Sequence, residues 1–540
     1  MTPEEHMRCV EAALSVNDIP RAIDAAEAAV RDGVRHPLLH NLIAHRLEEQ
    51  GRLDDSIAEL RRGLELAPDD MQLLTTLGFS LIQKEQRSEA LDVFDRTAAL
   101  YPDFPPAHFG RGSALERLGE LIGAGAAYER AVALAPDYAD AWSGLGDLAE
   151  RRGAREDAKV MAERALALSP HHLDAQMTLA RLANATKDYA GAETRLRAVL
   201  ADARLTPVAA ANARILLGDA LDGQGRIADA WAAYTDGNTR LRQLYRPVFE
   251  AGGLSSPADA ARRLAAEFAE TDPTDWIGKP DAAARGDVQS HSFLFGFARS
   301  GTTLLEQILA THPDVIALEE RPTLHDTEMD FVTLAGGMQT LAKLDDTALR
   351  PYREAYWRRV RGFGVEPAGK AFLDKFPLNT FKIPLIVKLF PDAKLLFALR
   401  DPRDVVLSCF RRTFRMNTSM YMFTDIEAAA RYYSAVMASA VVYRERLALN
   451  LHEVRYEALV DDFEGEARRI CDFLGLAWTD ELKDFAETSK RRGVATPSAV
   501  QVSRGLYRDG MGQWRRYAEQ LKAVEPILAP WIERYGYPAS

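Results

Sequence analysis

The first 245 residues repeat one pattern of small, apolar and polar positions every 34 residues. Successive units end in a similar short sequence whose last residue is a proline, at Pro68, Pro102, Pro136 and Pro170. Small residues recur in two phases between these prolines, first at Ala44, Gly78, Gly112, Gly146 and Ala180 and then at Ala90, Ala124, Ala158 and Ala192. Small residues at fixed spacing let two helices approach closely, so the pattern predicts a series of packed helix pairs.

This period and its small residues resemble the tetratricopeptide repeat. Units begin near residues 3, 37, 71, 105, 139 and 173, and a seventh, with Gly218 and Ala230 in matching phase, begins near residue 211. The resemblance implies an all-α solenoid over residues 1–245, with a concave surface that holds a peptide or a partner protein. An array that only shields or orders the C-terminal half is the alternative.

Residues 246–287 are rich in Gly, Pro, Ser, Asp and Ala, a composition typical of a linker. Within this stretch Ser256 precedes Pro257, which is the pattern of a helix N-cap followed by a proline in the first turn. We therefore expect one helix, from Ala258 to Thr271, inside the linker.

Residues 293–310 combine an apolar strand, a turn of small residues and an amphipathic helix. The turn should direct successive backbone N–H groups into one concavity at the helix N-terminus, which favours an anion, and its members are Ser300, Gly301, Thr302 and Thr303. The spacing imitates a P-loop, but Thr302 stands where the lysine of that motif would be, which disfavours a kinase. Arg299 supplies the positive charge instead.

A second strand, Lys394 to Leu399, runs into a polar turn and another helix. Arg400 lies at the carboxyl end of this strand, and Ser408, two turns into the helix, can face the same anion. Ligands of open α/β sheets bind at such strand ends. Two anion sites on neighbouring strands indicate a nucleotide with phosphates at its 5′ and 3′ positions.

These elements resemble the 5′ and 3′ binding elements of sulfotransferases that use 3′-phosphoadenosine 5′-phosphosulfate (PAPS). The phrases at residues 374–379 and 454–459 are similar to segments of the same family. The resemblance covers residues 290–535 and is to bacterial tetratricopeptide-repeat sulfotransferases and, more distantly, to protein-tyrosine sulfotransferases. It implies that residues 288–540 form an α/β, P-loop-like sulfotransferase domain with a central parallel sheet.

The resemblance also implies roles for individual residues. Residues 299–303 bind the 5′-phosphosulfate of PAPS, and Arg400 and Ser408 bind its 3′-phosphate. Glu320 aligns with the general base that acts on the acceptor hydroxyl, and Lys375 with the lysine that stabilises the leaving group. Sulfuryl transfer needs a base and nearby cations, and it has no need of a metal.

Several of these roles have rivals. Glu319 is as acidic as Glu320, but adjacent strand residues point to opposite faces, so we expect only one of them, Glu320, to face the cavity. His325 is an alternative base, because histidine serves in small-molecule sulfotransferases. Lys375 has the alternative of a surface lysine, and Cys409 is expected to be a buried small hydrophobe.

Residues 488–508 form a basic, hydroxyl-rich segment that resembles the closing loop of the family, in which Ser498 approaches the phosphosulfate. A solvated basic loop is the alternative. The chain departs from its relatives at residues 503–505, where they have Arg-Gln-Pro, and at Pro322, where the tyrosine-specific enzymes have an arginine. The acceptor is therefore left open between peptide, glycan and small alcohol.

Composition narrows the picture further. The net charge of −12 disfavours broad nucleic-acid binding. Three scattered cysteines do not make a disulfide framework or a zinc site, and no apolar stretch approaches the roughly 18 residues of a membrane span. We expect a cytoplasmic sulfotransferase whose acceptor is held partly by the repeats, with a homodimer as an open option. The alternative is a repeat adaptor that binds nucleotide without activity.

Overall fold

The structure is a computed structural model that describes residues 1–251, 255–276, 278, 282–492 and 508–539. It divides into two compact units, residues 1–182 and 183–540. The division falls inside one helix, α11 (Leu173–Ala185), because the helices that follow it pack with the C-terminal half. The limits expected from the sequence, 1–245, 246–287 and 288–540, stay predictions.

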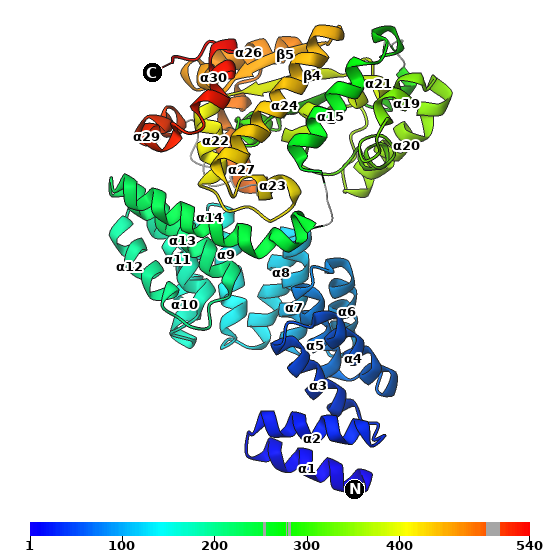
Figure 1. Ribbon diagram of the computed structural model, residues 1–540, viewed down its shortest axis with the longest axis vertical. Helices are drawn as coiled ribbons and strands as arrows, with labels where there is room; N and C mark the ends of the chain where they lie inside the picture. Colours follow the sequence, from blue (N-terminus) through cyan, green and yellow to red (C-terminus); the bar gives the residue numbers. More distant parts are fainter. Residues whose placement is uncertain (252–254, 277, 279–281, 493–507, 540) are drawn as a thin grey trace. The chain divides into compact units, whose positions relative to one another are not determined.

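The first unit consists of antiparallel helix pairs, as the 34-residue period predicts (Figure 1). The members of each pair follow one another in the chain: α1 (Pro3–Ser15) and α2 (Ile19–Arg31), α3 (Pro37–Glu49) and α4 (Leu53–Leu66), α5 (Met71–Gln83) and α6 (Arg87–Leu100), α7 (Pro105–Leu118) and α8 (Leu121–Leu134), α9 (Ala139–Arg151) and α10 (Arg155–Leu168).

The repeated small residues make room for aromatic side chains. Phe94 on α6 is fully buried, and a Cβ atom at Gly78 on α5 or at Gly110 on α7 would overlap its ring. Tyr128 on α8 is held in the same way by Gly112 and Gly144. Each such ring therefore joins its own helix pair to the next, which is the packing that the sequence pattern predicts.

Four helices open the second unit: α12 (Tyr189–Leu200), α13 (Pro207–Gly223), α14 (Ile227–Phe249) and α15 (Pro257–Ala269). The pair α13–α14 is the predicted seventh unit, with Tyr234 packed against Gly218. The helix expected in the linker is confirmed as α15, and its cap is Ser256, whose Oγ accepts the backbone N–H of Asp259.

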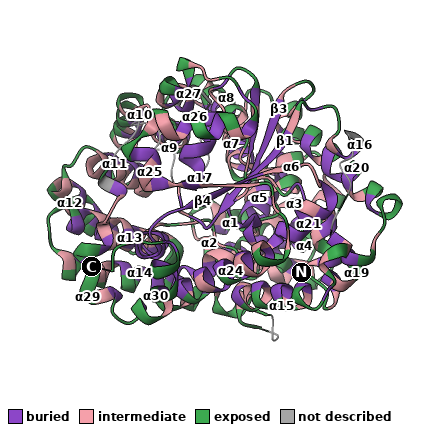
Figure 2. Cartoon of the chain, turned by 90° about the horizontal axis from the view of Figure 1, so that it is seen from above, coloured by how far each residue is buried: buried purple, intermediate pink, exposed green. Residues whose placement is uncertain are grey.

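The rest of the second unit is built on a five-stranded sheet in the order β2-β3-β1-β4-β5, in which every neighbouring pair is parallel. This confirms the predicted central parallel sheet. Its inner strands are buried on both faces (Figure 2), as parallel sheets covered by helices require. The strands are β1 (Ser290–Gly296), β2 (Val315–Glu319), β3 (Ala371–Lys375), β4 (Lys394–Leu399) and β5 (Leu451–Arg455).

Helices cover both faces of this sheet. One face packs on α17, α25 and α26 in an apolar core. The described helices after α15 are α16 (Ala282–Arg285), α17 (Thr302–Leu309), α18 (His325–Phe331), α19 (Gly337–Lys343), α20 (Asp346–Gly362), α21 (Ile383–Leu389), α22 (Pro402–Phe410), α23 (Thr418–Met422), α24 (Ile426–Arg446), α25 (Tyr456–Asp461), α26 (Phe463–Leu474), α27 (Phe485–Arg492), α29 (Ala518–Leu521) and α30 (Glu525–Arg534).

Short 3₁₀ helices join several of these elements: η2 (Pro273–Trp276), η3 (Pro377–Lys382), η4 (Asp480–Asp484), η5 (Arg508–Gly510) and η6 (Gln513–Tyr517). In the described part of the chain, no helix has both the length and the apolar character needed to cross a membrane.

Replacing Phe94 with alanine should lower the free energy of unfolding of the first unit by about 3–5 kcal/mol, because a fully buried ring between two glycines leaves a cavity. Urea unfolding followed by circular dichroism measures the loss. Ile122→Ala is the control, since this side chain is exposed and its loss should change stability by less than about 0.5 kcal/mol. Equal stabilities of the two variants would contradict the packing described here.

Asp374, on β3, should make the stability of the second unit depend on pH. Its carboxylate accepts hydrogen bonds from Thr323 and Tyr356, but burial outweighs them and raises its pKa to about 6. The folded state therefore binds this proton more tightly than the unfolded chain, in which an aspartate titrates near pH 3.9. The carboxyl stabilises the fold at low pH, and this contribution is lost as the pH rises through about 6.

The variant Asp374→Asn cannot titrate at this position. Its free energy of unfolding, relative to the unchanged protein, should rise by about 1–1.5 kcal/mol between about pH 5 and about pH 7.5. Urea unfolding followed by tryptophan fluorescence at both pH values measures the difference. A difference that is independent of pH would show that Asp374 titrates normally.

Candidate active site

The predicted anion loop lies between β1 and α17. Gly301 has φ +99° and Arg299 has φ +69°, so the loop turns twice through the left-handed region before the helix begins at Thr302. A Cβ at Gly301 would come within 2.8 Å of the Tyr456 ring, and one at Gly296 would meet Ser300 Oγ at 2.6 Å. Neighbouring side chains therefore pack tightly against the loop. Its backbone N–H groups lie at the N-terminus of α17, the position at which helices bind anions.

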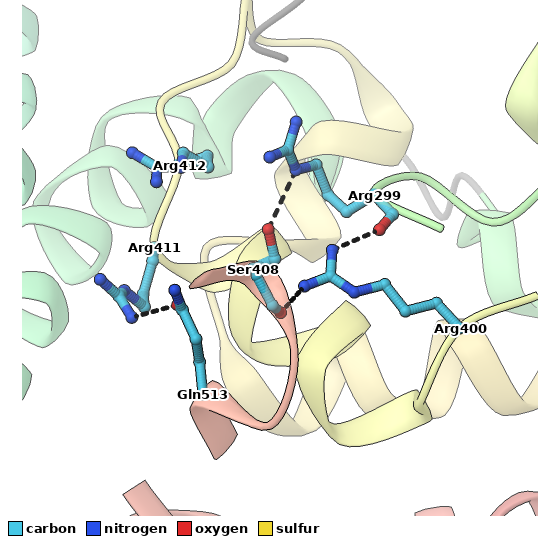
Figure 3. Close-up of a pocket in the computed structure, with 7 residues that line it drawn as sticks. Arg299, Arg400, Ser408, Arg411, Arg412 and Gln513 are labelled. Atoms are coloured by element: carbon cyan, nitrogen blue, oxygen red, sulfur yellow. Dashed lines mark hydrogen bonds between the residues drawn. The ribbon is translucent and has the colours of Figure 1, made fainter. Parts of the chain in front are cut away.

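A polar pocket lies beside this loop (Figure 3). Arg299 Nε donates to Ser408 Oγ at 3.0 Å, and Arg400 Nη1 donates to the carbonyl oxygen of Arg299 at 3.0 Å. The structure thus brings together three predicted residues from the β1–α17 loop, the end of β4 and helix α22. The lining residues are Arg299, Arg400, Ser408, Arg411, Arg412, Gly510 and Gln513.

Four of these lining residues were not predicted from the sequence. Arg411 and Arg412 follow α22 directly, three and four residues after Ser408, and this helical spacing could have indicated that they share its face. Gln513 contributes its amide, and Gly510 contributes a carbonyl oxygen that accepts from Arg400 Nη2. A backbone carbonyl leaves no signal in a pattern of side chains.

The charge of the pocket suits an anion. Four guanidinium groups line it, and the buried Nε of Arg400 has no hydrogen-bond partner among the described residues. The Arg400 guanidinium also lies 4.8 Å from the centre of the Tyr456 ring. Guanidinium groups form forked, charge-assisted hydrogen bonds with phosphate oxygens, so these residues fit a phosphate group.

A second cluster surrounds Lys375, the last residue of β3. Its Nζ lies 2.7 Å from Glu320 Oε1, 3.4 Å from Glu306 Oε2 and 3.5 Å from Glu319 Oε1. The side chains of Lys375 and Glu306 are fully buried, whereas that of Glu320 is 37% exposed. Burial by itself lowers the pKa of Lys375, but the three carboxylates outweigh it and raise the pKa above its ordinary value. The lysine is therefore held as an ammonium ion.

This geometry excludes one alternative and corrects one expectation. The alternative of a surface lysine is excluded, because Lys375 is fully buried. The expected alternation of Glu319 and Glu320 is wrong, since both carboxylates contact Lys375. The reason is local: β2 ends at Glu319, and Glu320 has φ +43°, which turns its carboxylate back toward the same lysine.

Glu306 is a member of the cluster that the sequence did not identify. It lies on α17, a helix in which all eight residues are buried and Glu306 is the one ionisable group. A carboxylate in such a helix is costly unless it is paired, and this cost is the signal that could have pointed to it. Through Glu306, the helix that begins at the anion loop also reaches the Lys375 cluster.

The other predicted residues fall in three groups. Cys409 is confirmed as buried, and burial raises the pKa of its thiol to about 12. His325 is exposed at the start of α18, and among the described residues no contact joins it to Lys375 or Glu320. Ser498 lies outside the described residues, as do residues 503–505. Within the described ranges, no group of three or more His, Cys, Asp or Glu side chains is arranged so that it could hold a metal ion.

Comparisons with known proteins agree with both halves of the chain. Residues 292–480 match the model of the sulfotransferase family. Models of the tetratricopeptide repeat match residues 10–70, 75–139, 123–159 and 151–215. The solved structure of a tetratricopeptide repeat protein from Parabacteroides merdae aligns with 44% of this chain and 93% of its own at 17% identity, with a TM-score of 0.36. That score is too low to add to the repeat assignment.

Curated relatives match over less than half of the chain. An uncharacterized protein of Aquifex aeolicus is 28% identical over 260 residues, which are 45% of this chain and 34% of that protein. Protein-tyrosine sulfotransferase A of Caenorhabditis elegans is 26% identical over 275 residues, 45% of this chain and 66% of that enzyme.

A bacterial enzyme, omega-hydroxy-beta-dihydromenaquinone-9 sulfotransferase Stf3 of Mycobacterium bovis, is 26% identical over 232 residues, 41% of this chain and 53% of its own length. The chain thus spans between a third and two thirds of the length of these three relatives. Together, these comparisons show that residues within 10–215 are tetratricopeptide repeats and that residues 292–480, which hold most of the parallel sheet, match the sulfotransferase family.

Proposed function

We propose that this protein is a PAPS-dependent sulfotransferase that moves a sulfuryl group to a hydroxyl acceptor. The observation that carries the proposal is the position of α17. Its N-terminus forms the anion loop beside the arginine pocket, and its Glu306 contacts Lys375, which also contacts Glu320. The short helix α17 thus connects the proposed anion site with the cluster that contains the partly exposed Glu320 carboxylate.

The pocket supports binding of a nucleotide with two phosphate ends. In this proposal residues 299–303 hold the 5′-phosphosulfate at the start of α17, and Arg400 and Ser408 hold the 3′-phosphate. Arg412 lines the same pocket and adds a cation to that end. When bound, PAPS supplies the sulfuryl group, and the residues named here bind and orient it.

Glu320 is the proposed general base. It accepts the proton of the acceptor hydroxyl as the new oxygen–sulfur bond forms and the bond from sulfur to the bridging oxygen of the donor breaks. Lys375 stabilises the negative charge that develops on the departing phosphate oxygen. Ser498 keeps its predicted place near the phosphosulfate as part of the proposal.

The other carboxylates around Lys375 allow Glu320 to take up a proton without leaving the lysine uncompensated. Once Glu320 takes up a proton it no longer neutralises the lysine, but the fully buried Glu306 and the nearby Glu319 remain. Lys375 therefore keeps its charge at the moment when the leaving group needs it. In this proposal Glu320 takes up the proton while Glu306 and Glu319 keep Lys375 charged, so each of the three carboxylates around the ammonium group has a role.

The acceptor is proposed only as a hydroxyl compound, either a peptide or protein or a glycan. The relatives differ on this point, since their names specify protein tyrosine in one case and a hydroxylated menaquinone in another. Tetratricopeptide repeats suggest protein interaction, which supports an acceptor protein or peptide on the concave face. A cytoplasmic location belongs to the same proposal.

Replacing Arg400 with alanine should weaken binding of the product nucleotide 3′-phosphoadenosine 5′-phosphate (PAP) by about tenfold or more, because a charge-assisted hydrogen bond is worth roughly 1.5–3 kcal/mol. Isothermal titration calorimetry measures the change. Arg431→Ala is the matched control, since Arg431 is 61% exposed and pairs only along its helix with Glu427 among the described contacts. Unchanged affinity in Arg400→Ala, or no binding by the unchanged protein, would refute the pocket assignment.

Replacing Glu320 with glutamine should lower sulfuryl transfer by about 10²- to 10⁴-fold while leaving PAP affinity within about twofold, because an amide cannot take the proton. Transfer of label from radiolabelled PAPS to components of a cell lysate measures turnover, and calorimetry measures binding. Glu354→Gln, which changes an exposed glutamate on α20, should retain full activity. Full activity in Glu320→Gln would assign the base to another group.

A further inference from the structure

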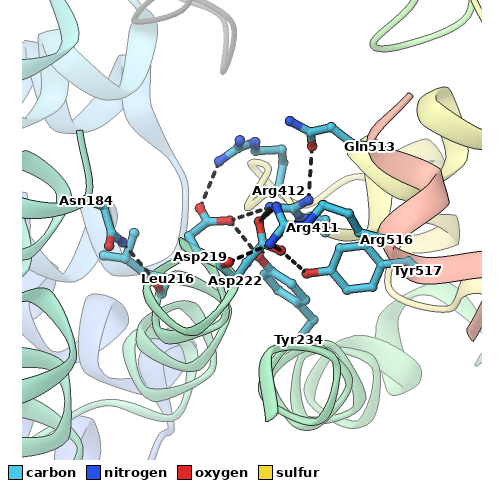
Figure 4. Close-up of polar contacts among 10 residues, drawn as sticks. All are labelled: Asn184, Leu216, Asp219, Asp222, Tyr234, Arg411, Arg412, Gln513, Arg516 and Tyr517. Atoms are coloured by element: carbon cyan, nitrogen blue, oxygen red, sulfur yellow. Dashed lines mark hydrogen bonds and ion pairs between the residues drawn. The ribbon is translucent and has the colours of Figure 1, made fainter. Parts of the chain in front are cut away.

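The last helix pair of the repeats, α13–α14, is joined to the arginine pocket by a network of charged and aromatic side chains (Figure 4). Asp219 and Asp222, near the C-terminal end of α13, reach Arg411 and Arg412, the two residues that follow α22. Asn238 on α14 adds a buried hydrogen bond of 2.7 Å to the carbonyl oxygen of Phe410. Two carboxylates of the repeats therefore touch two cations of the proposed nucleotide site.

The contact between Arg411 and Asp222 is a fixed tie. Arg411 is buried, donates to Asp222 Oδ2 at 2.9 Å, and lies between the rings of Tyr234 and Tyr517, 5.2 and 5.3 Å from their centres. Asp222 is itself buried and also accepts from Tyr517 and Arg516. Breaking a buried, hydrogen-bonded ion pair leaves an uncompensated charge, so this contact should persist with or without a ligand.

The contact between Arg412 and Asp219 differs in exposure. The Arg412 side chain is 32% exposed and lines the pocket, and its Nη1 donates to Asp219 Oδ2 at 2.9 Å. Asp219 has two further contacts through its Oδ1, which accepts the Tyr234 hydroxyl at 2.7 Å and lies 3.5 Å from Arg411 Nη2. A partly exposed pair of this kind contributes little to stability and can exchange partners.

We propose that Asp219 is a positioning residue that competes with the phosphate of the bound nucleotide for Arg412. The inference rests on the proposed function and goes beyond it, because it makes the last repeat part of nucleotide recognition. A phosphate monoester carries close to two negative charges and three acceptor oxygens, so it is a stronger partner for a guanidinium than one carboxylate. Nucleotide binding then releases the Arg412–Asp219 tie and leaves the Arg411–Asp222 tie in place.

The coupling is reciprocal. If the nucleotide weakens the hold of Asp219 on Arg412, then strengthening that hold must weaken nucleotide binding by the same factor. A ligand that shifts α13 would therefore change affinity at the pocket. The structure assigns this role to Asp219 and assigns to Asp222 only the maintenance of the pocket wall.

The test replaces Asp219 with asparagine, which removes the charge and keeps an oxygen for the Tyr234 hydroxyl. Asp219→Asn should bind PAP about two- to fivefold more tightly than the unchanged protein in calorimetry, because the competitor has lost its charge. A purely structural role would weaken binding or leave it unchanged, so a gain is the distinguishing result. Unchanged or weaker binding by Asp219→Asn overturns the proposal.

A double-mutant cycle locates the effect. In an Arg412→Ala background the Asp219→Asn change should lose most of its gain in PAP affinity, because the cation for which Asp219 and the phosphate compete is gone and Arg411 remains paired with Asp222. An equal gain in that background would show a general electrostatic effect and would overturn the proposal. Asp236→Asn is the matched control: it removes the same charge from the same helix pair, where Asp236 pairs with Arg214 and Arg240, and should leave PAP affinity unchanged.

The results distinguish a failure of this inference from a failure of the proposed function on which it rests. If the unchanged protein binds PAP and Asp219→Asn does not bind it more tightly, only the competition is wrong. If the unchanged protein does not bind PAP, both proposals fall. Circular dichroism of each variant confirms folding before the titrations.

Discussion

The parallel arrangement of the sheet is the constraint on which the rest of the second unit depends. Because neighbouring strands run in one direction, their carboxyl ends meet at a single edge. The chain leaves β1 toward β2 and β3 on one side and returns to β4 and β5 on the other, so the end of β1 and the end of β4 face a common crevice. Arg299, Arg400 and Lys375 lie at this edge for that reason.

Burial of an ammonium group explains the second feature of the site. Removing Lys375 from water is costly unless opposite charges compensate for it, and three carboxylates do so. They are not equivalent, since Glu306 is sealed inside the fold while Glu320 is partly exposed. A fixed counter-ion and an accessible one in the same cluster allow the accessible carboxylate to change its proton without loss of the lysine charge.

The last helix pair of the repeats belongs to the compact unit that contains the sheet. Its ties run from α13 to the residues after α22, and one of them, through Asp222, also holds the segment that begins with η6. Repeats are commonly regarded as a separate binding module joined to an enzyme by a linker. Here the seventh repeat contacts Arg411 and Arg412, two of the residues that line the pocket, so the compact unit that holds the pocket begins inside the repeats and not at the linker.

The sequence by itself determined the elements whose signals are local. The 34-residue period predicted the helix pairs because each repeat buries the same small and apolar positions. The strand, turn and helix around Arg299 predicted an anion loop because this succession places backbone N–H groups at a helix N-terminus. Only the tertiary structure placed Glu306 against Lys375, turned Glu320 toward the same lysine, and joined Asp219 to Arg412. These contacts link segments that are distant in the chain or depend on a single backbone angle, and a pattern of residue types records neither.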